Sequence, residues 1–112
     1  MKKIKTLKEH EQELIKNLTT DGWKAKTQDL EYKAELYCVR AKKKTFFIFK
    51  RVHIYVLVKE VTEDNLEELI DLIKDNFLNY HAIWLAADFF SEKVQEFARN
   101  KQQIGLLKIE VK

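Results

Sequence analysis

The chain has 112 residues, of which 46% are hydrophobic and 35% are charged, and its formal net charge is +3. This length and this balance predict one globular domain over residues 1–112 and exclude a disordered tail. No stretch approaches the roughly 20 apolar residues of a transmembrane helix, and no apolar segment follows the lysine-rich start as it would in a signal peptide. We therefore expect a cytoplasmic protein without a membrane partner.

The first half of the chain predicts one helix and a run of strands. Apolar residues at 7, 14, 15 and 18 predict an amphipathic helix from residue 5 to about 19, which ends at Asp21-Gly22. Strand-like runs follow at 23–27, 34–41 and 45–50, and Lys42-Lys43-Lys44 is interpreted as a hairpin tip. The alternating run at 53–61 is either a separate strand or a continuation of the third.

The second half predicts two helices and two strands. Thr62 is expected to cap a helix that reaches Phe77, and Ser91 a helix that reaches about Asn100. Residues 82–87 are apolar on both faces, which is typical of a buried parallel strand with helices on either side. Residues 104–111 alternate as a final strand. The order α-β-β-β-(β)-α-β-α-β, without proline, predicts one α/β layer structure.

Some chemistries are excluded by what the sequence lacks. Cys38 is the single cysteine, and the histidines at 10, 53 and 81 lack zinc-ligand spacing. Gly22 and Gly105 are the two glycines, so a glycine-rich loop for nucleotide phosphates is excluded. Cys38 also has no histidine near it in sequence, and a cysteine-nucleophile mechanism lacks its usual setting.

Charge is distributed unevenly along the chain. The first half is basic, whereas the segment from Glu63 to Asp75 is acidic apart from Lys74. Such a dipolar surface can orient a polyanion, although charge runs more often form solvated hairpin tips and helix faces. We expect nucleic acid to contact a set of basic side chains in the first half: Lys24, Lys26, Lys42, Lys43, Lys44 and Arg51. Aromatic residues interleave with these lysines and can stack on unpaired bases, or can simply form core.

Three short motifs resemble one nuclease superfamily. They are Glu11-Gln12-Glu13-Leu14-Ile15-Lys16 followed by Gly22-Trp23, then Ala34-Glu35-Leu36, and then Phe47-Ile48-Phe49-Lys50. In this order they resemble the restriction-endonuclease-like, or PD-(D/E)XK, superfamily, and within it the archaeal Holliday junction resolvases. The resemblance covers roughly residues 9 to 87. It implies a single-domain restriction-endonuclease-like fold with a mixed central sheet flanked by helices, and a homodimer, in which Phe89-Phe90 would be a subunit contact.

The resemblance also implies roles for three residues. Glu11 would be the acid carried by the helix, Glu35 a ligand of Mg²⁺, and Lys50 the residue that positions the attacking water. Positions 48 and 50 would share one strand face, with Glu35 opposite them on the paired strand. Position 48, where the superfamily has its second carboxylate, holds Ile48, and a hydrocarbon cannot coordinate magnesium.

The sequence therefore favours a DNA- or RNA-binding protein that is catalytically impaired. Two alternatives stay open. One is an active metal-dependent endonuclease or junction resolvase in which Asp29, Glu31 or Glu60 supplies a displaced carboxylate near Lys50. The other is a protein-interaction domain whose contact face is the acidic helix at 62–77.

Overall fold

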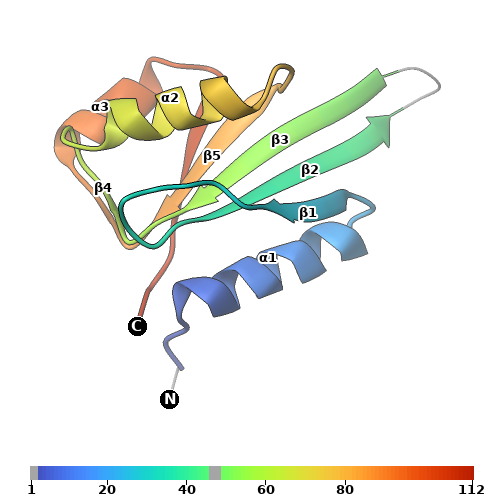
Figure 1. Cartoon of the computed structure of the whole chain (residues 1–112), viewed down its shortest axis with the longest axis horizontal. Coiled ribbons are helices and arrows are strands. Elements are labelled where there is room, and N and C mark those ends of the chain that lie inside the picture. Colours follow the sequence, from blue (N-terminus) through green and yellow to red (C-terminus); the bar gives the residue numbers. More distant parts are fainter. Residues whose placement is uncertain (1–2, 46–48) are drawn as a thin grey trace.

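The fold is built around a five-stranded mixed sheet. The computed structural model describes residues 3–45 and 49–112. Its elements, in chain order, are α1 (Leu7–Thr20), β1 (Lys24–Gln28), β2 (Tyr37–Thr45), β3 (Phe49–Leu57), β4 (Glu60–Val61), α2 (Leu66–Asn76), β5 (Ala82–Ala87), β6 (Phe89–Phe90), α3 (Glu92–Arg99) and β7 (Ile104–Lys108) (Figure 1).

The sheet has the strand order β1-β2-β3-β5-β7. β1, β2 and β3 are antiparallel neighbours, whereas β5 is parallel to both β3 and β7. β4 and β6 form a separate two-stranded parallel sheet. The predicted mixed α/β fold is thus confirmed, as is the buried parallel strand at 82–87, because β5 is parallel to both of its neighbours and four of its six residues are buried.

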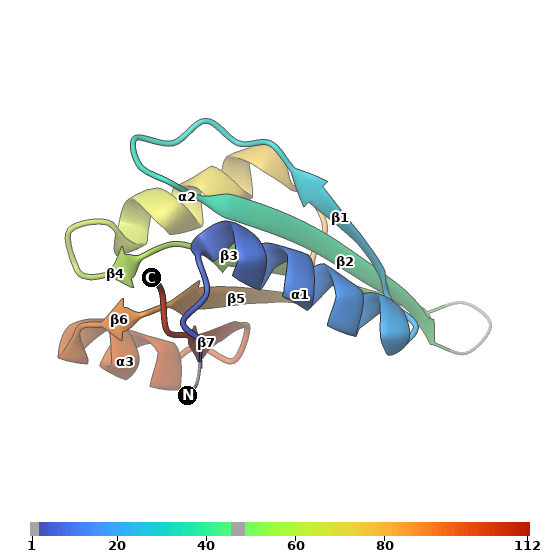
Figure 2. The ribbon, with the colours of Figure 1, turned by 90° about the horizontal axis from the view of Figure 1, so that it is seen from below.

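Helices lie on both sides of the sheet, with α1 on one face and α2 and α3 on the other (Figures 1 and 2). Each helical layer packs against the sheet and buries an apolar cluster of its own. On the α1 side the buried residues are Leu7, Leu18, Val39, Ala41, Tyr55, Leu57 and Ala86. On the α2 side they include Val52, Ile54, Val56, Leu69, Ile73, Leu85 and Val94.

Local capping explains where α1 begins and ends. The Thr6 hydroxyl accepts from the Glu9 amide, and the Glu9 carboxylate accepts from the Thr6 amide, which completes a capping box. These hydrogen bonds to Thr6 lower the pKa of Glu9. Gly22 has φ +90°, a conformation that favours glycine, and it turns the chain from α1 into β1. The helix predicted between residues 5 and 19 is confirmed.

The hairpin between the second and third strands was placed wrongly by the sequence. Lys42-Lys43-Lys44 is not a tip: it lies inside β2, which runs on to Thr45. The run at 45–50 is not one strand either, because Thr45 ends β2 and pairs with Phe49 at the start of β3. β3 then continues to Leu57, so the run at 53–61 belongs largely to the third strand.

Smaller differences occur at the ends of other elements. β2 begins at Tyr37 rather than at residue 34, so Glu35 precedes the strand. α2 begins after Asn65, because Thr62 forms a turn in which its amide donates to Asn65 Oδ1 and its hydroxyl accepts from the Asp64 amide. The Ser91 cap on α3 is confirmed, with its hydroxyl accepting from the Val94 amide.

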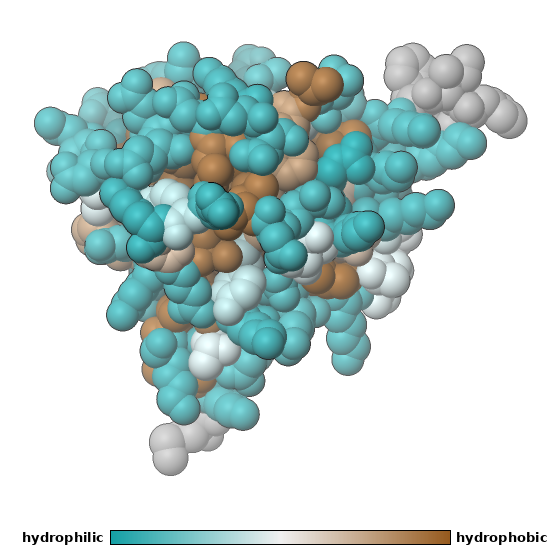
Figure 3. Space-filling view, viewed as in Figure 1, coloured by the Kyte–Doolittle hydropathy of each residue, from teal (hydrophilic) through white to brown (hydrophobic). Residues whose placement is uncertain are grey.

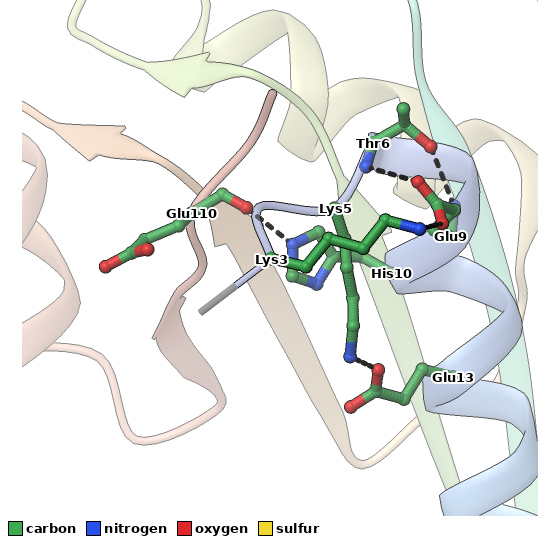
Figure 4. Close-up of polar contacts among 7 residues, drawn as sticks. All are labelled: Lys3, Lys5, Thr6, Glu9, His10, Glu13 and Glu110. Atoms are coloured by element: carbon green, nitrogen blue, oxygen red, sulfur yellow. Dashed lines mark hydrogen bonds and ion pairs between the residues drawn. The ribbon is translucent and has the colours of Figure 1, made fainter. Parts of the chain in front are cut away.

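The two terminal segments lie side by side. Lys5 and Val111 form a parallel bridge, and the Lys112 amide donates to the Lys5 carbonyl at 2.9 Å. Figure 4 shows the side chains around this junction, where His10 Nε2 donates to the Glu110 carbonyl at 2.6 Å. α1 is therefore held to the C-terminal segment that follows β7 as well as to the sheet.

The surface is mostly hydrophilic. Figure 3 shows hydrophobic residues near the middle of the face seen in Figure 1 and hydrophilic residues along the projecting end of β2 and β3. Within the described part of the chain, no helix is both long enough and apolar enough to cross a membrane.

Candidate nucleic-acid interface

Glu11 is held inside the molecule by a threonine. The side chain belongs to α1 and is only 7% exposed. Its Oε2 accepts a hydrogen bond from the Thr27 hydroxyl on β1 at 3.2 Å. A carboxylate with so little access to water needs such a donor, because its hydration is lost on burial. Glu11 thus lies between α1 and the sheet, and its predicted catalytic role stays a prediction.

Glu13, in the same motif, has a different environment. It forms an ion pair with Lys5 of the N-terminal segment (Figure 4). Lys3 lies 4.0 Å from Glu9 one turn earlier. These contacts fasten the start of the chain to α1, so this acidic side chain of the motif serves a local structural purpose.

Glu35 lies just before β2, where it is bound by a tyrosine. The Tyr37 hydroxyl donates to Glu35 Oε2 at 3.0 Å, and this hydrogen bond, followed by burial, raises the pKa of Tyr37. Glu35 also lines a pocket of about 370 Å³ together with Lys59, Glu60 and Asp64. Glu60, one of the candidates that the sequence offered for a displaced carboxylate near Lys50, instead lies at the same pocket as Glu35.

Lys50 does not face Glu35, which corrects the geometry expected from the sequence. In the antiparallel pairing of β2 with β3, Lys50 lies opposite Lys44, and Tyr37 lies opposite Leu57. Lys44 lies seven positions after Tyr37 along β2, which at roughly 3.4 Å per residue is about 24 Å. The strand end near Glu35 therefore carries Leu57 and Lys59. Ile48, the other half of the expected arrangement, lies outside the described residues.

The structure offers no preformed magnesium site in the residues that it describes. Among residues 3–45 and 49–112, no group of three or more histidine, cysteine, aspartate or glutamate side chains is arranged to hold a metal ion. Hard divalent cations need several oxygen ligands. The role of Glu35 as a metal ligand stays a prediction.

Six basic side chains share one face of the three antiparallel strands. Side chains alternate between the faces of a strand, and the registers Lys24↔Lys42 and Lys44↔Lys50 place partners on the same face. We call this set the cationic sheet face. It consists of Lys24 and Lys26 on β1, Arg40, Lys42 and Lys44 on β2, and Lys50 on β3.

This face is the one that α2 covers farther along the sheet. Cys38 and Val52 on the same face are buried in the cluster beneath α2. Beyond that cluster Lys24, Lys26, Lys44 and Lys50 are exposed, and Arg40 and Lys42 are partly exposed. None of the six takes part in an ion pair within the described ranges, where the paired lysines are Lys3, Lys5, Lys33 and Lys108. The cationic sheet face is therefore an unneutralised positive surface.

Two of the predicted contact residues lie on the opposite face. Lys43 pairs with Arg51 in the register, one position out of phase with Lys42 and Lys44. Lys43 Nζ lies over the Trp23 ring, 5.7 Å from its centroid. The six predicted contact residues thus divide between two surfaces. Arg40 was missed, although the spacing of Arg40, Lys42 and Lys44 is the two-residue period of a strand face.

Comparison with known proteins bears on the fold. No protein-family model matches the chain, and no curated protein matches it in sequence. Among solved structures, the chain resembles the apo form of EndoMS with a TM-score of 0.56 and 10% sequence identity. The match covers 91% of this chain and 47% of that one, so the chain spans about half the length of its structural neighbour. At this identity the likeness establishes a shared fold.

Proposed function

We propose that this protein binds nucleic acid through the cationic sheet face and does not cleave it efficiently. The observation that carries the proposal is the gathering of six basic side chains on one face of β1, β2 and β3, where none of them has a carboxylate partner among residues 3–45 and 49–112. Same-face side chains stand about 7 Å apart along a strand and about 5 Å apart between strands. A rigid lattice of this spacing can contact several phosphates together, because DNA carries one negative charge per roughly 1.7 Å of duplex.

The structural neighbour supports nucleic acid as the ligand. EndoMS is an endonuclease, and 91% of this chain shares the fold of part of EndoMS. Proteins with one fold can differ in function, so the fold supports the class of ligand less strongly than the charges do. The two observations are independent, and both favour a polyanionic partner of the nucleic-acid type.

The proposed lack of efficient cleavage rests on the residues around Glu35. Opposite Tyr37, at the strand end beside Glu35, stands Leu57, which is 2% exposed and belongs to the apolar cluster under α1. A hydrocarbon at this position supplies no oxygen to a divalent cation. The sequence led to the same expectation through Ile48, which lies outside the described residues.

The first test measures binding of a labelled DNA duplex over a series of salt concentrations. Each phosphate contact contributes about −0.9 to the slope of log K against log salt. The Lys24→Gln/Lys42→Gln variant should weaken binding and make this slope shallower by about two. The matched control is Lys93→Gln/Lys101→Gln, which removes the same charge from α3 and from the segment that follows it, and should have a smaller effect.

Two results would contradict the proposal. Equal losses in the two double variants would mean that net charge, rather than the cationic sheet face, attracts DNA. Absence of salt-dependent binding to duplex and single-stranded DNA and RNA would remove nucleic acid as the ligand. The acidic, exposed surface of α2 would then be tested next, as the contact face of a protein-interaction domain.

One observation favours the active-enzyme alternative. Glu35, Lys59 and Glu60 line a common pocket, which brings carboxylates and a lysine together at the end of β3. Incubation with magnesium or manganese tests whether DNA is cut there. Cleavage lost in Glu35→Ala and Lys59→Ala, but kept in Lys50→Ala, would establish the endonuclease with a displaced carboxylate. Cleavage lost in Lys50→Ala would restore the assignment that the sequence motif implies.

A further inference from the structure

The face of the sheet opposite the cationic sheet face carries a cluster of four aromatic rings. Trp23 and His53 have ring centroids 4.8 Å apart, and Tyr55 and Trp84 are stacked with centroids 6.3 Å apart. His53 joins the two pairs, because its ring lies 6.4 Å from both Tyr55 and Trp84. We call Trp23, His53, Tyr55 and Trp84 the aromatic platform. It contains both tryptophans of the chain.

The platform is not completely covered by α1. Tyr55 is buried at 8% exposure, whereas Trp23, His53 and Trp84 are each partly exposed. α1 packs mainly along β1 and β2, while His53 and Trp84 belong to β3 and β5. Trp23 and Trp84 pack against the buried cluster under α1 without belonging to it. The three partly exposed rings present apolar surface at the outside of the molecule.

Glycine on the neighbouring strand sets the position of the Trp84 ring. Gly105 pairs with Trp84, and the six-membered part of the indole fills the space that a side chain at 105 would take. The ring therefore lies against the backbone of β7. The indole NH donates to His53 Nδ1 at 3.4 Å. With Nδ1 accepting, the neutral His53 ring carries its proton on Nε2, which is thus a donor.

Positive charge borders the platform on its own face. Lys43 lies over Trp23, and Arg51 is exposed in the strand position next to Lys43 and two residues before His53. Burial, followed by the charges of Arg51 and His81, lowers the pKa of His53. Aromatic faces beside fixed cations match a nucleotide with its base unpaired, because the base can stack while the cations meet the phosphate.

We infer that the aromatic platform binds an unpaired base of a single-stranded nucleic-acid segment, with Lys43 and Arg51 at its phosphate. This inference rests on the proposed function and extends it, since it adds a stacking site on the sheet face away from the cationic sheet face. A duplex in which every base is paired presents no base faces to the platform. The chain should therefore recognise single strands, or duplexes with unpaired positions, by more than charge.

The test uses the wild-type protein and two oligonucleotides of equal length and charge. One is oligothymidylate, and the other has the same backbone with abasic tetrahydrofuran units. Because both tryptophans lie in the platform, their fluorescence reports directly on stacking. We expect oligothymidylate to quench this fluorescence and to bind roughly tenfold more tightly than the abasic strand, which should leave it unchanged.

Variants locate the site. Trp84→Leu should lose most of the preference for oligothymidylate over the abasic strand, and Trp84→Phe, which keeps an aromatic face, should retain much of it. Phe97→Leu removes an aromatic ring from α3, where Lys101 lies over it, and serves as the control with an unchanged preference. Circular dichroism spectra of each variant establish whether it is folded before its affinity is compared.

The outcomes separate this inference from the proposed function. Equal affinity for the two strands, without quenching, would overturn the stacking site and leave phosphate binding in place. Preference for oligothymidylate that survives Trp84→Leu in a folded variant would also overturn it. Failure of oligothymidylate, the abasic strand and duplex DNA all to bind would overturn the proposed function, and the stacking site with it.

Discussion

The indole of Trp84 fills the space that a side chain at Gly105 would occupy on the neighbouring strand. A Cβ at position 105 would stand 2.3 Å from Cζ3 of the indole and 2.5 Å from Cε3. These distances are far shorter than any real contact between carbon atoms, so the indole can lie against β7 only because residue 105 has no side chain. The position of the aromatic platform thus depends on a glycine of the neighbouring strand.

Gly105→Ala should destabilise the protein by about 1–3 kcal/mol, as expected for forced overpacking. The added methyl group must displace the indole of Trp84, or the backbone of β7 must move away from β5. Urea unfolding followed by circular dichroism measures this loss as a lower midpoint.

A double-mutant cycle assigns the loss to this pair. In a Trp84→Ala background the space is empty, so Gly105→Ala should cost much less than it does in the wild type. Equal costs in the two backgrounds would show that backbone preferences at position 105, and not the indole, require glycine.

Thr27→Val should also destabilise the protein, by about 1–2 kcal/mol at pH 7. The substitution keeps the shape of the side chain but leaves the buried Glu11 carboxylate without the hydroxyl donor that now lies 3.2 Å away. The same unfolding measurement applies, and Thr27→Ser, which keeps the hydroxyl, is the control. A larger loss in the serine variant than in the valine variant would contradict the importance of this hydrogen bond.

Cys38 should be inert in the folded protein. Its side chain has no exposure, and burial raises the pKa of the thiol to about 12. Since the thiolate is the reactive form, a thiol reagent at pH 8 should label the unfolded chain rapidly and the folded chain only through unfolding. Rapid labelling under native conditions would contradict the buried position.

The raised pKa of Cys38 also makes the stability of the folded protein depend on pH. An unfolded cysteine loses its proton near pH 9, whereas the folded one holds it to about pH 12. The folded state then binds more protons, so stability falls as the pH rises above 9. The free energy of unfolding of the wild type should therefore fall more steeply between pH 9 and 11 than that of Cys38→Ala.

The sequence predicted elements whose signals are local. The amphipathic helix that ends at Asp21-Gly22, the serine cap of α3 and the doubly apolar strand at 82–87 each depend on a few adjacent residues, and all three are present. The hairpin failed for a physical reason. Lys42 and Lys44 point to one face of β2 and Lys43 to the other, so the alternation of polar and apolar residues that marks a half-buried strand is lost there. A strand with two polar faces resembles a loop.

The arrangement of the candidate site depends on the pairing register between β2 and β3, and the spacing of the motifs in the sequence does not determine this register. Glu35 and Lys50 were expected to face each other because they lie on successive strand-like runs. The pairing of Tyr37 with Leu57 separates them along the whole of β2 and instead brings Lys59 to the pocket of Glu35. The basic character of the first half was visible in the sequence, but its division between two faces follows only from the register.

Asp88 should make the stability of the C-terminal segment depend on pH in the acidic range. Its carboxylate accepts from the Val111 amide and from Lys108 Nζ, each at 3.2 Å, and these hydrogen bonds, that of Val111 first, lower the pKa of Asp88. A lowered pKa contributes stability above the unfolded value of about 3.9, and this contribution is lost as the pH falls through the folded value. The melting temperature of Asp88→Asn should therefore lie below that of the wild type at pH 7, and the difference should shrink below pH 4. Glu96→Gln on the surface of α3 is the control. If the difference in melting temperature between Asp88→Asn and the wild type stays constant from pH 7 to pH 2.5, the aspartate acts through its shape and not through its charge.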